Sequence, residues 1–192
     1  GGTGKTTTAV NLAAELAARG AETLLIDLDT QGHASLGIGL PRISKDAPTA
    51  HTIFKDPGQL LRPAILSSPY RQLSIIPADP LYDGTGAHHG DMTVLARHLR
   101  EEGVVDDYDL IILDTPPSLD LLLMNALAAA HGTLVPLSPH PLGLHGVQQL
   151  IRLFYRVAST VNPDLKLVGL LPIMVDRRIR LHVSILEEAM RQ

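Results

Sequence analysis

This chain of 192 residues contains no cysteine and no tryptophan, and only 3% of its residues are aromatic. The absence of cysteine excludes disulfide bonds, zinc–thiolate centres and cysteine-held iron–sulfur clusters. Because 45% of the residues are hydrophobic and so few are aromatic, the core must consist mainly of Leu, Ile, Val and Ala. Such a core is typical of parallel strands between layers of helices, rather than of an aromatic-rich β-sandwich.

A strong positive charge and long apolar runs are also lacking. The net charge of −4 argues against a globally basic nucleic-acid-binding protein, so any DNA contact would need a local basic patch. The longest apolar stretch, Leu119–Ala130, is interrupted by Asp120 and Asn125 and is too short to cross a bilayer. We therefore expect a cytoplasmic protein, and no membrane contact is evident in this sequence.

Short apolar runs alternate with helical patterns along the chain. The predicted strands are Thr23–Leu28, Leu73–Pro77, Leu110–Asp114, Thr133–Leu137 and Lys166–Leu171. The predicted helices lie near residues 6–19, 91–102, 119–130, 144–160 and 179–191. This alternation predicts an α/β fold of the P-loop NTPase type, a doubly wound, mostly parallel sheet with helices on both faces.

Residues 32–72 are rich in Gly, Pro and Ser, with a short helical piece expected at His51–Lys55. We interpret this stretch as an excursion on the edge or face of the sheet rather than as a second domain. Residues 1–192 are accordingly expected to form a single P-loop ATPase domain.

The chain opens with most of a phosphate-binding loop, whose residues are Gly1, Gly2, Thr3, Gly4, Lys5, Thr6 and Thr7. The full pattern is G-x-x-x-x-G-K-[ST], in which backbone N–H groups cradle phosphate, the lysine reaches the terminal phosphates and the hydroxyl ligates Mg²⁺. The first glycine of the pattern would lie two residues before residue 1. The last helical pattern also stops without an end signal at Gln192, so we expect the chain to be truncated at both ends, with the strand that feeds the loop missing. The simpler interpretation of the loop is a Gly-rich turn before an ordinary helix.

Three aspartates end predicted strands, where carboxylates can reach a ligand at the sheet edge. Asp114 closes one strand and is expected to hold Mg²⁺ through water beside the phosphate loop. Asp27 and Asp29 lie two residues apart, so both point the same way on an extended segment. One of the pair could orient or deprotonate the attacking water and the other could bind Mg²⁺ through its hydration shell. The alternative for each is a carboxylate that only caps the following turn.

The nucleotide is expected to be ATP, because the sequence elements of guanine-specific sites are missing. Neither an N/T-K-x-D element nor a D-x-x-G after the second acidic strand is present, and the turn after Asp114 reads Thr115-Pro116-Pro117 instead.

Four ordered motifs over nearly the whole chain resemble the ParA/MinD family of deviant Walker-A ATPases, and the ParA (Soj) branch most. The motifs are GGTGKTTTAVNLAAELAARG, LLIDLDTQGHASLGIGL, YDLIILDTPPSLDLLLMNALAAA and GLHGVQQL with NPDLKLVGLLPIMVDRR. The resemblance implies a homodimer that forms on ATP binding, non-specific DNA binding by that dimer, and slow hydrolysis stimulated by a ParB-like partner. Such a protein would segregate plasmids or chromosomes and would associate with the nucleoid.

The resemblance assigns roles to individual residues. Lys5 matches the phosphate-loop lysine, Thr6 the Mg²⁺ ligand, Asp29 the residue that positions the hydrolytic water, and Asp114 the second acidic motif. The family's signature lysine would lie directly before Gly1. Departures from the family pattern are Thr30 for Pro, His33 for Asn, and the segment 140–146, in which histidines replace two acidic residues.

The basic cluster of the chain consists of Arg177, Arg178 and Arg180, at the start of the last helical pattern. Arg178 matches an arginine in the family's M-x-D-x-R element that contributes to DNA binding, and arginine contacts phosphate without reading bases. A solvated helix face is the alternative. The nine histidines do not have the spacing of a dedicated metal site.

Two other functions remain open at this stage. A MinD-like or other cargo-positioning ATPase would act on a membrane or a protein scaffold instead of DNA. A metabolic P-loop ligase of similar fold would need a pocket for a carboxylate substrate, which the sequence does not indicate.

Overall fold

The computed structural model describes residues 2–41, 44, 46–56, 58–84, 90–176 and 178–189. Its main sheet has the strand order β2-β3-β1-β4, formed by Leu66–Ser67, Leu73–Ile76, Thr23–Asp27 and Leu110–Asp114. β1 runs parallel to β3 and β4, whereas β2 pairs antiparallel to β3. The predicted mostly parallel α/β sheet is therefore confirmed.

Two further strands, β5 (Gly132–Leu137) and β6 (Lys166–Pro172), pair in parallel as a separate sheet. Within the described residues β4 and β5 are not paired with each other. The strand expected upstream of the phosphate loop stays a prediction.

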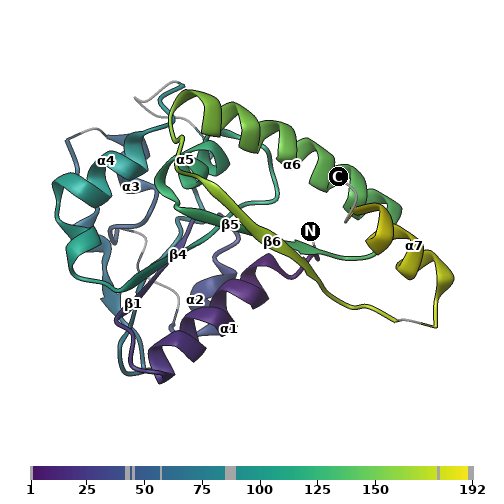
Figure 1. Ribbon diagram of the computed structural model, residues 1–192. Coiled ribbons are helices and arrows are strands. Elements are labelled where there is room, and N and C mark those ends of the chain that lie inside the picture. The colour runs from purple at the N-terminus through teal and green to yellow at the C-terminus, as the bar shows by residue number, and fades with distance from the viewer. Residues whose placement is uncertain are drawn as a thin grey trace.

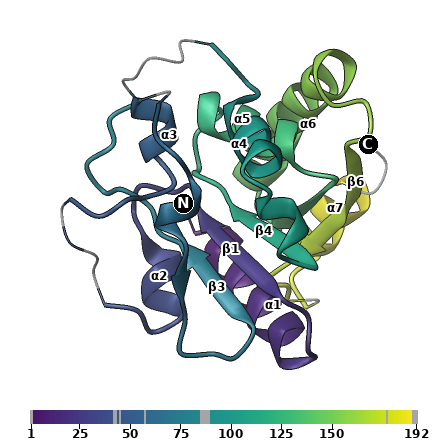
Figure 2. The same ribbon diagram turned by 90° about the vertical axis from the view of Figure 1, so that its left-hand side faces the viewer.

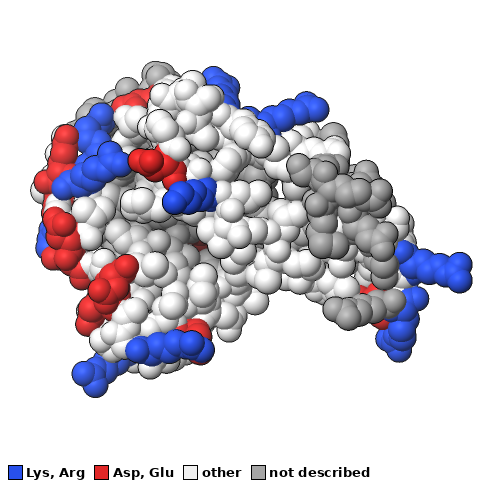
Figure 3. All heavy atoms as spheres, in the orientation of Figure 1, with Lys and Arg blue, Asp and Glu red and all other residues white. Residues whose placement is uncertain are grey.

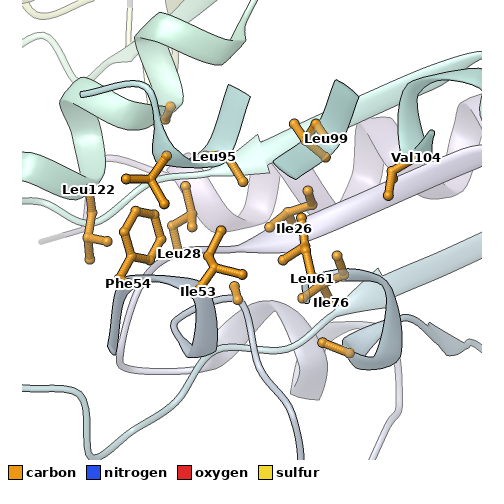
Figure 4. Packing of buried hydrophobic residues seen from close by; sticks show 14 of the residues in the cluster. Ile26, Leu28, Ile53, Phe54, Leu61, Ile76, Leu95, Leu99, Val104 and Leu122 are labelled. Carbon is orange, nitrogen blue, oxygen red and sulfur yellow. The ribbon is translucent and has the colours of Figure 1, made fainter. Parts of the chain in front are cut away.

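Helices cover both faces of the main sheet (Figures 1 and 2). One face packs against α1 (Lys5–Ala18) and α2 (His33–Gly37), and the other against α3 (Thr52–Lys55), α4 (Val94–Glu101) and α5 (Leu121–Ala129). Successive residues of β1 alternate between these layers, as the strand geometry requires. Leu25 therefore packs with α1, while Leu24 and Ile26 belong to the opposite cluster shown in Figure 4.

Residues of the 32–72 segment, which we interpret as an excursion on the edge or face of the sheet, contribute to both of its core clusters. In Figure 4 the buried side chains of Ile53 and Phe54 lie beside Leu28, and Leu61 lies beside Ile26 and Ile76. The segment also contains β2, α2 and the 3₁₀ turn η1 (Arg62–Ala64), which the sequence analysis did not identify. These elements are too short to show a helical or strand period.

After β5 the chain forms α6 (Pro141–Thr160), β6 and α7 (Arg180–Ala189). α6 confirms the helix predicted near residues 144–160, and its Val147 and Val157 are buried against β5 and α5 respectively. A further 3₁₀ turn, η2, spans Val104–Asp106 before β4. In the described part of the chain, no helix has both the length and the apolar character needed to span a bilayer.

Candidate nucleotide-binding site

The phosphate loop leads directly into α1. Gly2 and Gly4 have φ angles of 86° and 67°, a backbone conformation that favours glycine. A Cβ atom on Gly4 would lie 2.8 Å from Cδ1 of Ile173, so this position also needs the smallest residue. Gly4 caps α1 without a side-chain hydrogen bond. The N–H groups of the first turn, which contains Lys5, Thr6 and Thr7, are thus available to an anion at the positive end of the helix dipole.

Asp114 ends β4 directly beside this loop and is 1% exposed. In the described structure neither of its carboxylate oxygens has a hydrogen-bond partner of normal geometry. Burial raises the pKa of Asp114, while the nearby Thr6 hydroxyl and the charge of Lys5 oppose that rise. A buried carboxylate without a partner is costly for a protein to keep, unless a ligand completes it.

Asp27 lies next to Asp114, because the two residues are register partners on β1 and β4. Unlike Asp114 it is well bonded, since its oxygens accept hydrogen bonds from the N–H groups of Asp29 and Ala34, each at 3.1 Å. Burial, and then the charge of Asp114, raise the pKa of Asp27 to about 7. A buried pair of like charges is relieved either by a proton or by a cation.

Asp29 follows β1 and is only half-buried. Its Oδ1 accepts the Gln31 N–H at 3.0 Å, and its carbonyl accepts the Gly32 N–H at 2.8 Å, so the turn after the strand is well defined. The charge of Asp29 raises the pKa of both Asp27 and Asp114. The three carboxylates therefore lie within electrostatic reach of one another, as their positions at strand ends predict.

The residues present suit Mg²⁺ bound together with a nucleotide. Magnesium in such sites is held by one or two protein oxygens together with substrate phosphates and water. The unpartnered oxygens of Asp114 and the hydroxyl of Thr6 provide that donor set. Within the described residues no group of three or more His, Asp or Glu side chains is arranged as a metal site of its own. The nucleotide would thus be an essential part of the magnesium site.

The predicted DNA-binding arginines lie apart from this site. Arg178 and Arg180 stand at the start of α7, a corner from which basic side chains project (Figure 3). Arg178 is 90% exposed and contacts Asp176 through two nitrogens, at 3.0 and 2.8 Å. Arg177, like Gly1 of the phosphate loop, lies outside the described residues.

Sequence reasoning missed three residues that shape the site. Ile173 packs against Gly4 from the segment after β6. Asp120 caps α5 by accepting the N–H groups of Leu122 and Leu123. His51 is fully buried and bonds the backbone at the end of β1. The Asp120 cap could have been found from its place before an apolar helix, but the other two depend on contacts far apart in the sequence.

Comparisons with known proteins identify a matching family model and several relatives of this chain. A family model described as an AAA domain (AAA_31) matches residues 1–167. The chain is 41% identical over 179 residues to the chromosome-partitioning ATPase Soj of Thermus thermophilus, covering 93% of this chain and 67% of that protein. It is 40% identical over 197 residues to the chromosome partitioning protein ParA of Myxococcus xanthus, covering 98% of this chain and 66% of the relative. The chain thus spans about two thirds of the length of these relatives.

One solved structure with a different name is also similar. It is a cobyrinic acid a,c-diamide synthase from Mycobacterium smegmatis, with bound ATP analogue and magnesium. The TM-score is 0.85 at 31% sequence identity, covering all of this chain and 78% of that one.

Proposed function

We propose, on the basis that this chain belongs to the ParA/Soj family of ATPases, that it binds ATP with Mg²⁺, hydrolyses it, and uses the cycle to position DNA. The observation that carries the catalytic part is Asp114, a buried carboxylate beside Lys5 and Thr6 whose oxygens lack a hydrogen bond of normal geometry. ATP and Mg²⁺ are the ligands that satisfy all three side chains together.

Each side chain of the site has a role in this proposal. Lys5 binds the terminal phosphates, and the backbone N–H groups from Gly2 onward cradle them. Thr6 and Asp114 hold Mg²⁺, Asp114 through water, and Asp27 supports the same hydration shell. When bound, Mg²⁺ neutralises negative charge on the phosphates and stabilises the charge that develops during transfer. Asp29 orients the attacking water and accepts its proton.

The test of the catalytic proposal is Asp29→Ala. This variant should bind ATP as tightly as wild type, because Asp29 is not part of the phosphate loop, but its turnover should fall by at least about 100-fold. Binding is measured with a fluorescent ATP analogue and turnover by phosphate release. Equal turnover by the variant and wild type would show that Asp29 does not have this role.

The DNA-positioning part of the proposal rests on the arginines at the start of α7 and on the partition proteins among the relatives. ATP would close a homodimer, and the dimer would hold DNA non-specifically through Arg178, Arg180 and Arg177. A ParB-like protein would stimulate hydrolysis and release. The protein would then be cytoplasmic and associated with the nucleoid. An ATP-dependent electrophoretic shift of arbitrary DNA, together with ATP-dependent dimerisation on size exclusion, tests this part.

A metabolic ligase is the second candidate, favoured by the name of the Mycobacterium smegmatis structure. A ligase uses ATP to activate a carboxylate, so its ATP consumption depends on an acid substrate and a nitrogen donor. A positioning ATPase hydrolyses ATP without them. ATP consumption that appears only on addition of a carboxylic acid and an amine donor would favour the ligase. A MinD-like ATPase would instead bind vesicles and not DNA in the presence of ATP.

A further inference from the structure

His51 lies immediately before α3, is fully buried, and uses both of its ring nitrogens. Nδ1 accepts the N–H of Asp79 at 2.9 Å, and Nε2 lies 3.3 Å from the carbonyl oxygen of Leu28. Since Nδ1 accepts a hydrogen bond from a backbone N–H, it carries no proton of its own, and Nε2–H must donate to the Leu28 carbonyl. The contacts therefore select one neutral tautomer. The pKa of His51, which burial lowers to about 4, is consistent with a neutral ring.

Packing leaves this ring little freedom to move. It stacks on Tyr82 with a centroid distance of 4.6 Å and lies 6.5 Å from Phe54. Its backbone is held as well, because its N–H donates to Thr49 Oγ1 at 3.2 Å and the preceding Ala50 N–H donates to the Pro77 carbonyl at 2.9 Å. Figure 4 shows Phe54 and Leu28 in the same cluster as Leu122 of α5. The His51 ring is therefore held in one position, from which it can orient the two backbone groups that it bonds.

The bond to Leu28 acts on the peptide that leads into Asp29. The Leu28 carbonyl and the Asp29 N–H belong to the same peptide unit. His51 bonds its oxygen, and Asp27 Oδ1 accepts its N–H at 3.1 Å. The preceding N–H, that of Leu28, donates to the Asp114 carbonyl at 2.9 Å. The backbone from which the Asp29 side chain projects is thus held by His51 on one side, and by the Asp27 carboxylate and the Asp114 main-chain carbonyl on the other.

The bond from the Asp79 N–H to His51 Nδ1 connects the end of β3 to the same ring. Asp79 follows β3, which is paired in parallel with β1 through Ile26 and Ile76. His51 consequently ties the segments after β1 and β3 together at the carboxyl edge of the sheet, where ligands of open α/β sheets bind. An ion pair between Lys55 of α3 and Asp79 links the same two segments at the protein surface.

We propose that His51 is a positioning residue for ATP hydrolysis, which fixes the Leu28–Asp29 peptide and thereby the carboxylate of Asp29. The inference rests on the proposed function of Asp29. His51 itself touches neither the phosphate loop nor the reacting atoms in this arrangement, so it acts through Asp29 on turnover and leaves ATP affinity unchanged.

The experiment compares three variants of the purified protein. His51→Phe keeps a ring on Tyr82 but removes both ring hydrogen bonds, and His51→Gln retains a donor and an acceptor. Phe54→Leu is the matched control, because it loosens the same cluster without touching these bonds. We expect kcat to fall by about 10-fold in His51→Phe and by less in His51→Gln, since small errors in placing a catalytic group cost one to two orders of magnitude. The affinity for a fluorescent ATP analogue should stay within about twofold in all three variants. Phe54→Leu should lower Tm without lowering kcat.

A purely structural role predicts a different pattern. In that case His51→Phe and Phe54→Leu would lower Tm alike, and the folded fraction of each would turn over ATP at the wild-type kcat. That result, obtained with an active wild type, would overturn the inference and leave the proposed function intact.

An inactive wild type would instead refute the proposed function. The position of the Asp29 peptide is then read directly by amide hydrogen exchange. Protection of the Asp29 amide should fall by about 10-fold in His51→Phe and be largely recovered in His51→Gln. Unchanged protection in His51→Phe would overturn the inference by itself.

Discussion

The ends of β1 and β4 lie side by side at one edge of the sheet, but the chain treats their polar groups in opposite ways. At the end of β1 both oxygens of Asp27 accept backbone N–H groups, and the following carbonyl is bonded by His51. At the end of β4 the oxygens of Asp114 have no hydrogen bond of normal geometry in the described structure, and burial raises the pKa of this carboxyl although the nearby Thr6 hydroxyl and Thr115 N–H lower it. The difference shows which groups the fold itself holds in place and which it leaves for a ligand.

The two strands also differ in burial, although both sequences are short apolar runs that end in aspartate. Every residue of β1 is buried, whereas Leu110 of β4 is 40% exposed and its next three residues are only half-buried. β1 has a paired strand on each side, but β4 is paired only with β1 among the described strands. Burial thus depends on neighbours that the run of apolar residues does not specify.

Removing the positive charge of Lys5, beside the end of β4, should produce the largest effect. Lys5→Ala deletes the charge that faces Asp114 and the proposed contact to the terminal phosphates. ATP turnover should fall by about 100- to 1,000-fold, and binding of a fluorescent ATP analogue should weaken strongly, because a preorganised charge is lost from the site. Lys55→Ala, which removes a lysine paired with Asp79 outside the loop, is the matched control. Comparable losses in the two variants would mean that Lys5 has no special role.

Asp114→Asn tests whether the unpartnered carboxylate is kept for function at a cost in stability. Mg²⁺-dependent turnover should fall by about 100-fold, since a neutral amide is a poor partner for the cation. Without nucleotide, and in EDTA at pH 8, the variant should be more stable than wild type by about 1–2 kcal/mol, because a buried charge is removed. Urea denaturation measures the free energy of unfolding, with the exposed Asp106→Asn as control. A destabilised Asp114→Asn would show that this carboxylate is not under strain in the free protein.

At these strand ends, sequence reasoning identified some candidate residues and missed others. Lys5, Thr6, Asp27 and Asp114 could be proposed from the sequence because a local motif or a strand end suggests their chemistry. His51 was not, since its role depends on Leu28 and Asp79, which are distant in sequence. The larger strands and helices were likewise predicted from their hydrophobic periods. β2, with two residues, and the split between β4 and β5 depend on strand pairing, which no local period specifies.

The pH dependence of stability should separate the two titrating groups at the end of β1. Burial lowers the pKa of His51 from 6.5 to about 4. Between these pH values the unfolded chain binds a proton on His51 and the folded protein does not, so the free energy of unfolding decreases as the pH falls from 6.5 to 4. Asp79, Lys55 and Asp120 are the charged groups that act on this ring. The pKa of Asp27 is raised to about 7 from 3.8, so its contribution is lost in the opposite direction, as the pH rises from 3.8 to 7.

These slopes oppose each other between pH 4 and 6.5 and can be resolved with two variants. Relative to wild type, His51→Gln should lose stability more steeply as the pH rises through this range, by up to about 1.4 kcal/mol per pH unit. Asp27→Asn should show the reverse slope. Urea denaturation in EDTA at several pH values gives both differences. If the free energy of unfolding of a variant and of wild type varied with pH in parallel, the substituted group would not have the shifted pKa given above.

The smallest effect is expected far from this edge, at the start of α7. Arg178 is exposed and already paired with Asp176, which occupies two of its five N–H donors and offsets part of its charge. Arg178→Ala should therefore weaken non-specific DNA binding by only a few-fold and reduce the slope of log affinity against log salt by about 1. Arg19→Ala is the matched control, because Arg19 is a similarly exposed arginine paired with Glu15 on α1. An equal change in the salt slope for both variants would assign the effect to net charge. A change confined to Arg178→Ala would place the DNA contact at α7, separate from the carboxylate edge where the two strand ends differ.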